Sequence, residues 1–146
     1  MPVSVLLYED NKPLRESLIS LLQLNEALRL AGAFENVLLV KDQVGHLKPD
    51  IILMDIDMPE MSGIEAVREI RTINPAVPIL MLTVFDDNSH VFQAIQAGAS
   101  GYLLKKHIST KLFEAIDEAM AGGAPMSPTV ARMVIASMQK PQVDLD

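Results

Sequence analysis

Polar residues that could handle a metal-bound phosphoryl group follow apolar runs at four places in the chain. Asp55, Thr83 and Lys105 each come directly after such a run, and Glu9 and Asp10 follow the first one. A carboxylate can attack phosphorus or bind a divalent cation, a hydroxyl can donate to a phosphoryl oxygen, and an ammonium can neutralise its charge. Together these residue types predict phosphoryl chemistry.

Asp55 is the candidate nucleophile, because a carboxylate that attacks phosphorus forms an acyl phosphate. A lone aspartate after a strand more often caps a loop, so the prediction depends on the accompanying residues. Glu9 and Asp10 would bring two more carboxylates close to Asp55, and a divalent cation would relieve their mutual repulsion. Mg²⁺ prefers carboxylate, water and phosphate oxygens, and the backbone carbonyl of Asp57 is a further candidate ligand.

Four short apolar runs and a weaker candidate at 28–34 predict the strands that would position these residues. The runs do not alternate with polar residues, which is typical of strands buried on both faces of a parallel sheet. Helical segments separate them, so the predicted fold class is α/β, a doubly wound five-stranded parallel sheet. Ligand sites in such sheets lie outside the carboxyl ends of the strands, where the named polar residues should meet.

Capping signals predict where several helices begin. Ser62 opens a capping box, Ser109 is expected to cap the helix after the fifth predicted strand, and Ser127 is expected to cap an extra C-terminal helix. We divide the chain into a domain at 1–122 and, at 123–146, a joint, a sixth helix and the start of a linker. The sixth helix should dock on its own domain or on a second copy through an apolar stripe of Ala131, Val134, Ile135 and Met138.

The composition is that of one ordinary globular domain: 146 residues, 49% hydrophobic and 21% charged. A net charge of −7 argues against nucleic-acid binding by this chain itself, since phosphate contacts need clustered Lys and Arg. The apolar runs are too short to span a membrane, and no signal-peptide pattern precedes the first strand. The lack of cysteine excludes disulfides and thiolate metal sites, and it fits a cytoplasmic location.

The same polar residues, in this order and spacing, resemble the receiver domain of two-component response regulators over about 3–122. Each piece alone is weak, but the set is highly specific. The later pieces, with the stretch at 122–128, are similar to the NarL/FixJ subfamily, whose members usually carry a LuxR-type helix-turn-helix after a linker. The matching pieces are Glu9-Asp10, Met54-Asp55-Ile56-Asp57-Met58-Pro59, Ser62-Gly63, Leu82-Thr83-Val84-Phe85 and Ala97 to Lys105.

The resemblance implies a flavodoxin-like, CheY-like fold with strand order 2-1-3-4-5 and a phosphoacceptor function. Asp55 would accept phosphate from the phosphohistidine of a sensor histidine kinase. Glu9, Asp10, Asp55 and the Asp57 carbonyl would hold Mg²⁺. The receiver would catalyse its own phosphorylation and slow dephosphorylation without being a turnover enzyme.

The resemblance also implies a switch and an output. Thr83 and Lys105 would bind the phosphoryl group on Asp55, and Thr83 would leave space into which the switch aromatic Tyr102 rotates. A phosphorylation-dependent homodimer and control of transcription are further implications. The DNA-binding domain would be absent from this chain, either because a receiver has been excised from a longer protein or because the protein acts through partners alone.

Two positions depart from the family pattern, and two other functions compete with it. Glu9 stands where the family often has aspartate, so it could reach the metal through water. The residue after the family lysine is often a proline joined by a cis peptide bond; here it is Lys106, so we expect the Lys105–Lys106 bond to be trans. The spacing of Asp55 and Asp57 also fits a haloacid-dehalogenase-type phosphatase, although that motif normally follows the first strand. The remaining alternative is a degenerate receiver that serves as a constitutive interaction module.

Overall fold

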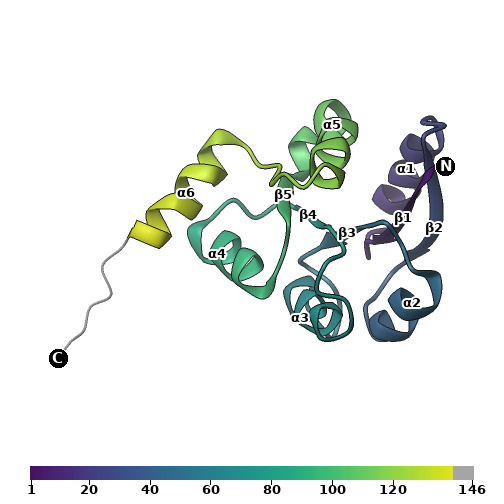
Figure 1. Ribbon diagram of the computed structural model, residues 1–146, viewed down its shortest axis with the longest axis horizontal. Helices are drawn as coiled ribbons and strands as arrows, with labels where there is room; N and C mark the ends of the chain where they lie inside the picture. Colours follow the sequence, from purple (N-terminus) through teal and green to yellow (C-terminus); the bar gives the residue numbers. More distant parts are fainter. Residues whose placement is uncertain (140–146) are drawn as a thin grey trace.

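Five parallel strands form one sheet in the computed structural model, which describes residues 1–139 (Figure 1). The sheet order is β2-β1-β3-β4-β5, which confirms the predicted doubly wound topology. Each neighbouring pair runs parallel, so the carboxyl ends of the strands lie at one edge of the sheet. The strands are β1 (Val3–Tyr8), β2 (Leu28–Phe34), β3 (Ile51–Asp55), β4 (Ile79–Thr83) and β5 (Gly101–Leu104).

Helices cover both faces of the sheet. α1 and α5 lie on one face, α2, α3 and α4 lie on the other, and α6 runs beside α4 (Figure 1). Among the helices within 1–139, none combines the length and apolar character that a membrane crossing requires. The helices are α1 (Lys12–Gln23), α2 (Val40–Leu47), α3 (Gly63–Ile73), α4 (Asn88–Ala97), α5 (Ile108–Met120) and α6 (Pro128–Gln139), and a 3₁₀ turn, η1 (Lys105–His107), precedes α5.

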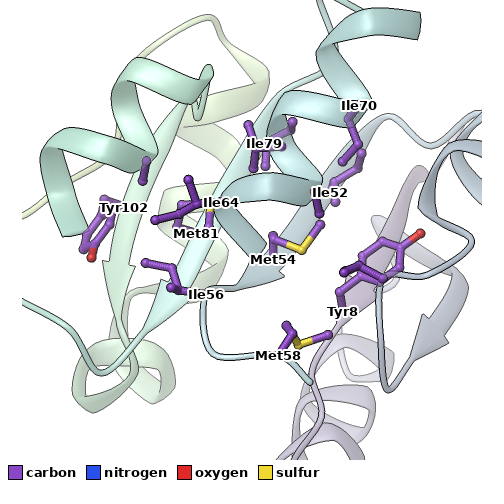
Figure 2. Packing of buried hydrophobic residues seen from close by; sticks show 14 of the residues in the cluster. Tyr8, Ile52, Met54, Ile56, Met58, Ile64, Ile70, Ile79, Met81 and Tyr102 are labelled. Atoms are coloured by element: carbon purple, nitrogen blue, oxygen red, sulfur yellow. The ribbon is translucent and has the colours of Figure 1, made fainter. Parts of the chain in front are cut away.

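Two hydrophobic cores, one on each face, explain why the apolar runs do not alternate. Successive strand residues point to opposite faces. Leu6 and Tyr8 of β1 therefore enter the core under α2, α3 and α4, while Val5 and Leu7 enter the core under α1 and α5. Figure 2 shows the first of these cores, with Tyr8 at one end and Tyr102 at the other. The two cores hold the central strands, and hence the strand ends, in a fixed register.

The helix starts agree with the capping predictions at Ser62 and Ser127 but not at Ser109. The Ser127 hydroxyl accepts from the Val130 amide at 3.1 Å in the first turn of α6. Ser62 forms the predicted capping box: its hydroxyl accepts from the Glu65 amide at 3.2 Å, and the Glu65 carboxylate accepts from the Ser62 amide at 3.2 Å. The expectation that Ser109 caps α5 was wrong. The helix begins at Ile108, whose amide donates to the Lys105 carbonyl. The chain passes directly from the 3₁₀ turn into α5, so the turn replaces a side-chain cap.

The segment before α6 extends the sheet beyond β5. The Tyr102 amide donates to the Pro125 carbonyl at 2.8 Å, and Met126 forms a parallel bridge with Tyr102. Gly101 permits this approach, because a Cβ there would lie 2.7 Å from the Pro125 carbonyl oxygen and from its ring. The C-terminal part of the chain is thus fastened to the outer edge of β5.

The sixth helix docks on its own domain, but not with the whole predicted stripe. Val130 is buried, and Met133 and Val134 pack against the core beside α4. Ile135 and Met138 are 40% and 78% exposed, so including them in the docking face was wrong. Apolar residues occur on both sides of this helix, and its periodicity therefore does not select one face.

Candidate functional site at the carboxyl edge of the sheet

The predicted site residues converge at the carboxyl edge of the sheet. Lys105 Nζ lies 3.0 Å from Asp55 Oδ2 and 3.0 Å from Glu9 Oε1, although these residues are 50 and 96 positions apart in the chain. The register explains the meeting, since Asp55 pairs with Leu82 and Thr83 pairs with Leu104, the residue before the lysine. The ammonium thus pairs with two carboxylates, one that follows β1 and one that ends β3.

Three carboxylates form a group with the composition of a magnesium site. Oxygens of Glu9, Asp10 and Asp55 lie within 4.8 Å of one another, with Glu9 and Asp55 1% and 2% exposed and Asp10 open to solvent. Glu9 Oε2 accepts from the Asn11 amide at 3.1 Å. Glu9 Oε1 is buried and accepts no hydrogen bond among residues 1–139, although the Lys105 ammonium lies 3.0 Å away and forms an ion pair with it. Such an oxygen, beside an exposed carboxylate, suits a hard cation that retains water.

Burial changes the acidity of the central carboxyl. Loss of solvent raises the pKa of Asp55 to about 7; the hydrogen bond and charge of Lys105 oppose this shift, while the like charge of Glu9 adds to it. Burial lowers the Lys105 pKa, but its contacts with Glu9 and Asp55 outweigh that effect, so its pKa is raised overall. Lys105 therefore remains a cation at neutral pH, whereas Asp55 is poised between its two protonation states.

Gly63 allows α3 to begin directly against the end of β3, a role that the sequence did not reveal. A Cβ at this position would lie 1.8 Å from the Asp55 carbonyl oxygen. The Gly63 amide donates to the Ile56 carbonyl at 2.8 Å, which ties the helix start to the strand end. The available signal was a glycine between a capping serine and an apolar helix, where most residues have a higher helix propensity.

Asp57 begins the loop between β3 and α3. Its side chain is exposed, and its amide donates weakly to Asp55 Oδ1 at 3.4 Å. Further along the loop Glu60 has a positive φ of 72°, and the Met61 amide donates to the Pro59 carbonyl at 2.8 Å. The chain therefore turns sharply after Asp57, as expected. Whether the Asp57 carbonyl binds metal stays a prediction.

Thr83 and Tyr102 meet at a shared neighbour, Phe85. The buried Thr83 hydroxyl accepts from the Phe85 amide at 3.1 Å, and the Tyr102 hydroxyl donates to the Phe85 carbonyl at 2.7 Å. The Tyr102 side chain is 1% exposed, and burial raises its pKa. Tyr102 therefore already occupies the inward position into which the switch hypothesis has it rotate. Sequence reasoning placed Phe85 in a family-like stretch but gave it no role.

The chain departs from the family pattern after Lys105 as expected. No peptide bond within residues 1–139 is cis, so the Lys105–Lys106 bond is trans. Lys106 itself is exposed, while the preceding ammonium points to the carboxylates. The spacing of Asp55 and Asp57 follows the third strand in sequence, β3, whereas the phosphatase alternative normally has it after the first strand.

Comparisons with known proteins agree with this geometry. The model of the response regulator receiver domain family matches residues 5–117. The chain is 37% identical over 128 residues to the transcriptional regulatory protein YdfI of Bacillus subtilis (strain 168), a match that covers 88% of this chain and 60% of YdfI. It is 32% identical over 138 residues to the transcriptional regulatory protein DegU of Brevibacillus brevis, which covers 94% and 58%. The chain thus spans about three fifths of the length of these relatives.

Solved structures share the fold. A LuxR-family two-component response regulator from Aurantimonas sp. SI85-9A1 superposes with a TM-score of 0.87 at 28% identity, covering 96% of this chain and 100% of that one. The signal receiver domain of the putative response regulator NarL from Mycobacterium tuberculosis gives 0.78 at 26% identity, covering 83% and 98%. The sequence match and the shared fold together show that the chain belongs to the response regulator receiver domain family, whose members act as phosphoacceptors in two-component signalling.

Proposed function

We propose that Asp55 accepts a phosphoryl group from the phosphohistidine of a sensor histidine kinase. One observation carries the assignment: the Asp55 carboxylate lies 3.0 Å from Lys105 and within 4.8 Å of both Glu9 and Asp10. The nucleophile thus has a counter-ion and two candidate metal ligands beside it. Asp55 Oδ2 accepts a hydrogen bond from the ammonium, so Oδ1, which accepts only a long 3.4 Å bond from the Asp57 amide, would attack phosphorus. The phosphorus–nitrogen bond of the donor breaks, and the departing imidazole takes up a proton.

Glu9, Asp10, Asp55 and the Asp57 carbonyl would hold Mg²⁺. When bound, Mg²⁺ supplies positive charge for the phosphoryl oxygens. The family binds this ion through acidic residues, and the three carboxylates, which include a buried Glu9 oxygen that accepts no hydrogen bond among residues 1–139, are a suitable donor set. One oxygen of the longer Glu9 side chain already accepts a hydrogen bond from the Asn11 amide, so Glu9 would bind the metal through its other oxygen or through water.

Lys105 and Thr83 would bind the phosphoryl group after transfer. Phosphorylation replaces a single negative charge with roughly −2, by analogy with other phosphorylated residues. A hydrogen bond to a charged group contributes about 1.5–3 kcal/mol, so two of them approach the ~5.5 kcal/mol that moves a two-state equilibrium from 1:99 to 99:1. Water would later hydrolyse the acyl phosphate and restore Asp55. The protein would thus catalyse its own phosphorylation and slow dephosphorylation.

The wider role follows from the relatives. We propose residues 1–122 as the receiver and 123–146 as a joint, a sixth helix and the start of a linker, and residues 140–146 of that linker lie outside the part of the chain that the structure describes. Because the matched relatives are transcriptional regulators and are longer, the output would be transcription through a DNA-binding domain outside this chain. By family resemblance the protein would act in the cytoplasm and form a phosphorylation-dependent homodimer.

Intact-mass spectrometry after incubation with acetyl phosphate tests the phosphoacceptor assignment. We expect one phosphoryl adduct per chain, dependent on Mg²⁺ and absent from Asp55→Asn. Asp57→Asn is the matched control, because only the backbone of Asp57 has a role in this proposal and its side chain is exposed. Stoichiometric labelling of Asp55→Asn would contradict the assignment. Steady turnover of small phosphate esters that Asp57→Asn abolishes would instead support the phosphatase alternative.

A further inference from the structure

The peptide unit around Phe85 connects the phosphoryl-binding threonine to the switch tyrosine. Its amide donates to Thr83 Oγ1 at 3.1 Å, and its carbonyl accepts from the Tyr102 hydroxyl at 2.7 Å. Phe85 is half-buried, whereas its chain neighbours Val84 and Asp86 are exposed. Any shift of this residue therefore changes the contacts of Thr83 and Tyr102 together.

The ring of Phe85 is held by the first turn of α4. It stacks on the imidazole of His90 with a centroid distance of 4.0 Å and an interplanar angle of 7°. Asp87 fixes that imidazole: its carboxylate oxygens lie 2.7 and 2.9 Å from His90 Nδ1, and one of them also accepts from the His90 amide at 3.0 Å. The cap of α4, the imidazole and the Phe85 ring thus form one continuous contact.

We propose that Phe85, His90 and Asp87 form a clip that positions Tyr102 inward and ties it to α4 before phosphorylation. The stack fixes the Phe85 backbone, and that backbone supplies the acceptor that keeps the Tyr102 hydroxyl buried. His90 and Asp87 therefore bias the switch toward the inward state through Phe85, which itself contacts Thr83 of the phosphoryl site. His90 and Asp87 are positioning residues in this arrangement.

The alternative to the clip is that the stack of Phe85 on His90 stabilises only the start of α4. In that case removing it would lower the stability of α4 without moving Tyr102. The two effects differ in their readout, because only the clip changes the distribution of Tyr102 between its inward and outward positions. A measurement on the Tyr102 ring therefore separates them.

Fluorine NMR on protein labelled with 3-fluorotyrosine gives that measurement. The chain contains two tyrosines, so Tyr8→Phe assigns both resonances. Aromatic pairs contribute enough that His90→Ala should change the inward-to-outward ratio of Tyr102 about two- to tenfold toward outward. His90→Phe keeps an aromatic ring for stacking and should retain the inward position. His46→Ala is the matched control, since that imidazole lies on α2, away from the clip, with its Nδ1 2.9 Å from the Asp42 carbonyl.

Phe85→Leu provides a second route to the same result, because it keeps an apolar side chain but removes the stack. We expect it to shift Tyr102 outward like His90→Ala. An unchanged Tyr102 resonance in both variants would overturn the clip, as would an equal shift in His46→Ala. Urea unfolding of each variant shows whether the fold is intact, and His90 is sufficiently exposed for the substitution to leave the core alone.

This inference uses Tyr102 as the switch aromatic of the proposed function, but its test requires no phosphorylation. Labelling of Asp55 by acetyl phosphate is scored separately on the same variants. A protein that fails to label while Tyr102 responds to His90→Ala would contradict the proposed function and keep the clip. A protein that labels normally while the Tyr102 resonance is unchanged by His90→Ala and Phe85→Leu would support the proposed function and contradict the clip.

Discussion

The substitution Gly63→Ala tests how tightly α3 is set against the phosphoacceptor strand. The added Cβ would lie 1.8 Å from the Asp55 carbonyl oxygen, whereas real contacts stay beyond 3.0 Å, so β3 and α3 must separate by about 1.2 Å. The obstacle is backbone and cannot rotate away. Overpacking of this kind typically costs 1–3 kcal/mol, and we expect a loss of about 3 kcal/mol in the free energy of unfolding.

The same displacement should reduce phosphorylation of Asp55. A misplacement of about 1 Å at a reacting group can lower a rate by roughly 10²-fold, and we expect a loss of that order in labelling by acetyl phosphate. Urea unfolding gives the stability, and intact-mass spectrometry at several times gives the rate. Because the carbonyl and the carboxyl belong to the same residue, both quantities should fall together.

Gly45→Ala is the matched control for this experiment. Gly45 lies within α2, and a Cβ there would meet nothing within 4 Å. Alanine should raise stability by roughly 0.5–1 kcal/mol there, because glycine is unfavourable inside a helix, and it should leave labelling unchanged. If Gly63→Ala unfolded at the wild-type urea concentration and labelled at the wild-type rate, the close approach of α3 to Asp55 would not be a requirement of the site.

Three further predictions concern Lys105, Asp55 and the attachment of the C-terminal segment. Lys105→Met removes both 3.0 Å ion pairs, so the Asp55 pKa should rise further and labelling by acetyl phosphate should fall roughly 10²-fold. The control Lys106→Met, at an exposed lysine, should leave labelling unchanged. Burial raises the Asp55 pKa to about 7, so labelling at limiting Mg²⁺ should increase from about pH 6 to about pH 8. The folded state holds this proton more strongly than the unfolded chain, so the metal-free protein should lose stability as the pH rises from about 4 to about 7 and level off above that, and Asp55→Asn should flatten the profile. Gly101→Ala should push away the Pro125 carbonyl and increase amide hydrogen exchange of α6, whereas Gly45→Ala should not.

The convergence of Asp55, Thr83 and Lys105 could be predicted because it follows from topology. Asp55 and Thr83 end buried strands and Lys105 follows one, and parallel strands bring their carboxyl ends to one edge whatever the details of packing. The family resemblance added the strand order and the assignment of Tyr102 as the switch aromatic. These features depend on the order of residues along the chain more than on individual distances.

Other features depend on distances that a sequence does not contain. The close approach at Gly63 appears only once α3 and β3 are placed together. The role of Phe85 rests mainly on its backbone groups, which every residue carries, so its side chain gave no signal. The docking face of α6 was partly misassigned because exposed Ile135 and Met138 carry the same hydrophobic signal as the packed Met133. Local sequence specified the elements, while tertiary packing chose between equivalent faces.

The pairing of Pro125 and Met126 with β5 has a consequence for self-association. An uncovered edge strand is a template for strands of other molecules, and β5 is an apolar stretch, Gly101–Leu104, without a charged residue. The attached segment occupies the Tyr102 amide, and its proline has no amide hydrogen with which to extend the ladder outward. A protein trimmed after Gly122 would leave that edge open, and it should aggregate at concentrations where the longer chain stays monodisperse. Pro125 and Met126 thus also block the addition of a strand from another molecule to the β5 edge of the sheet.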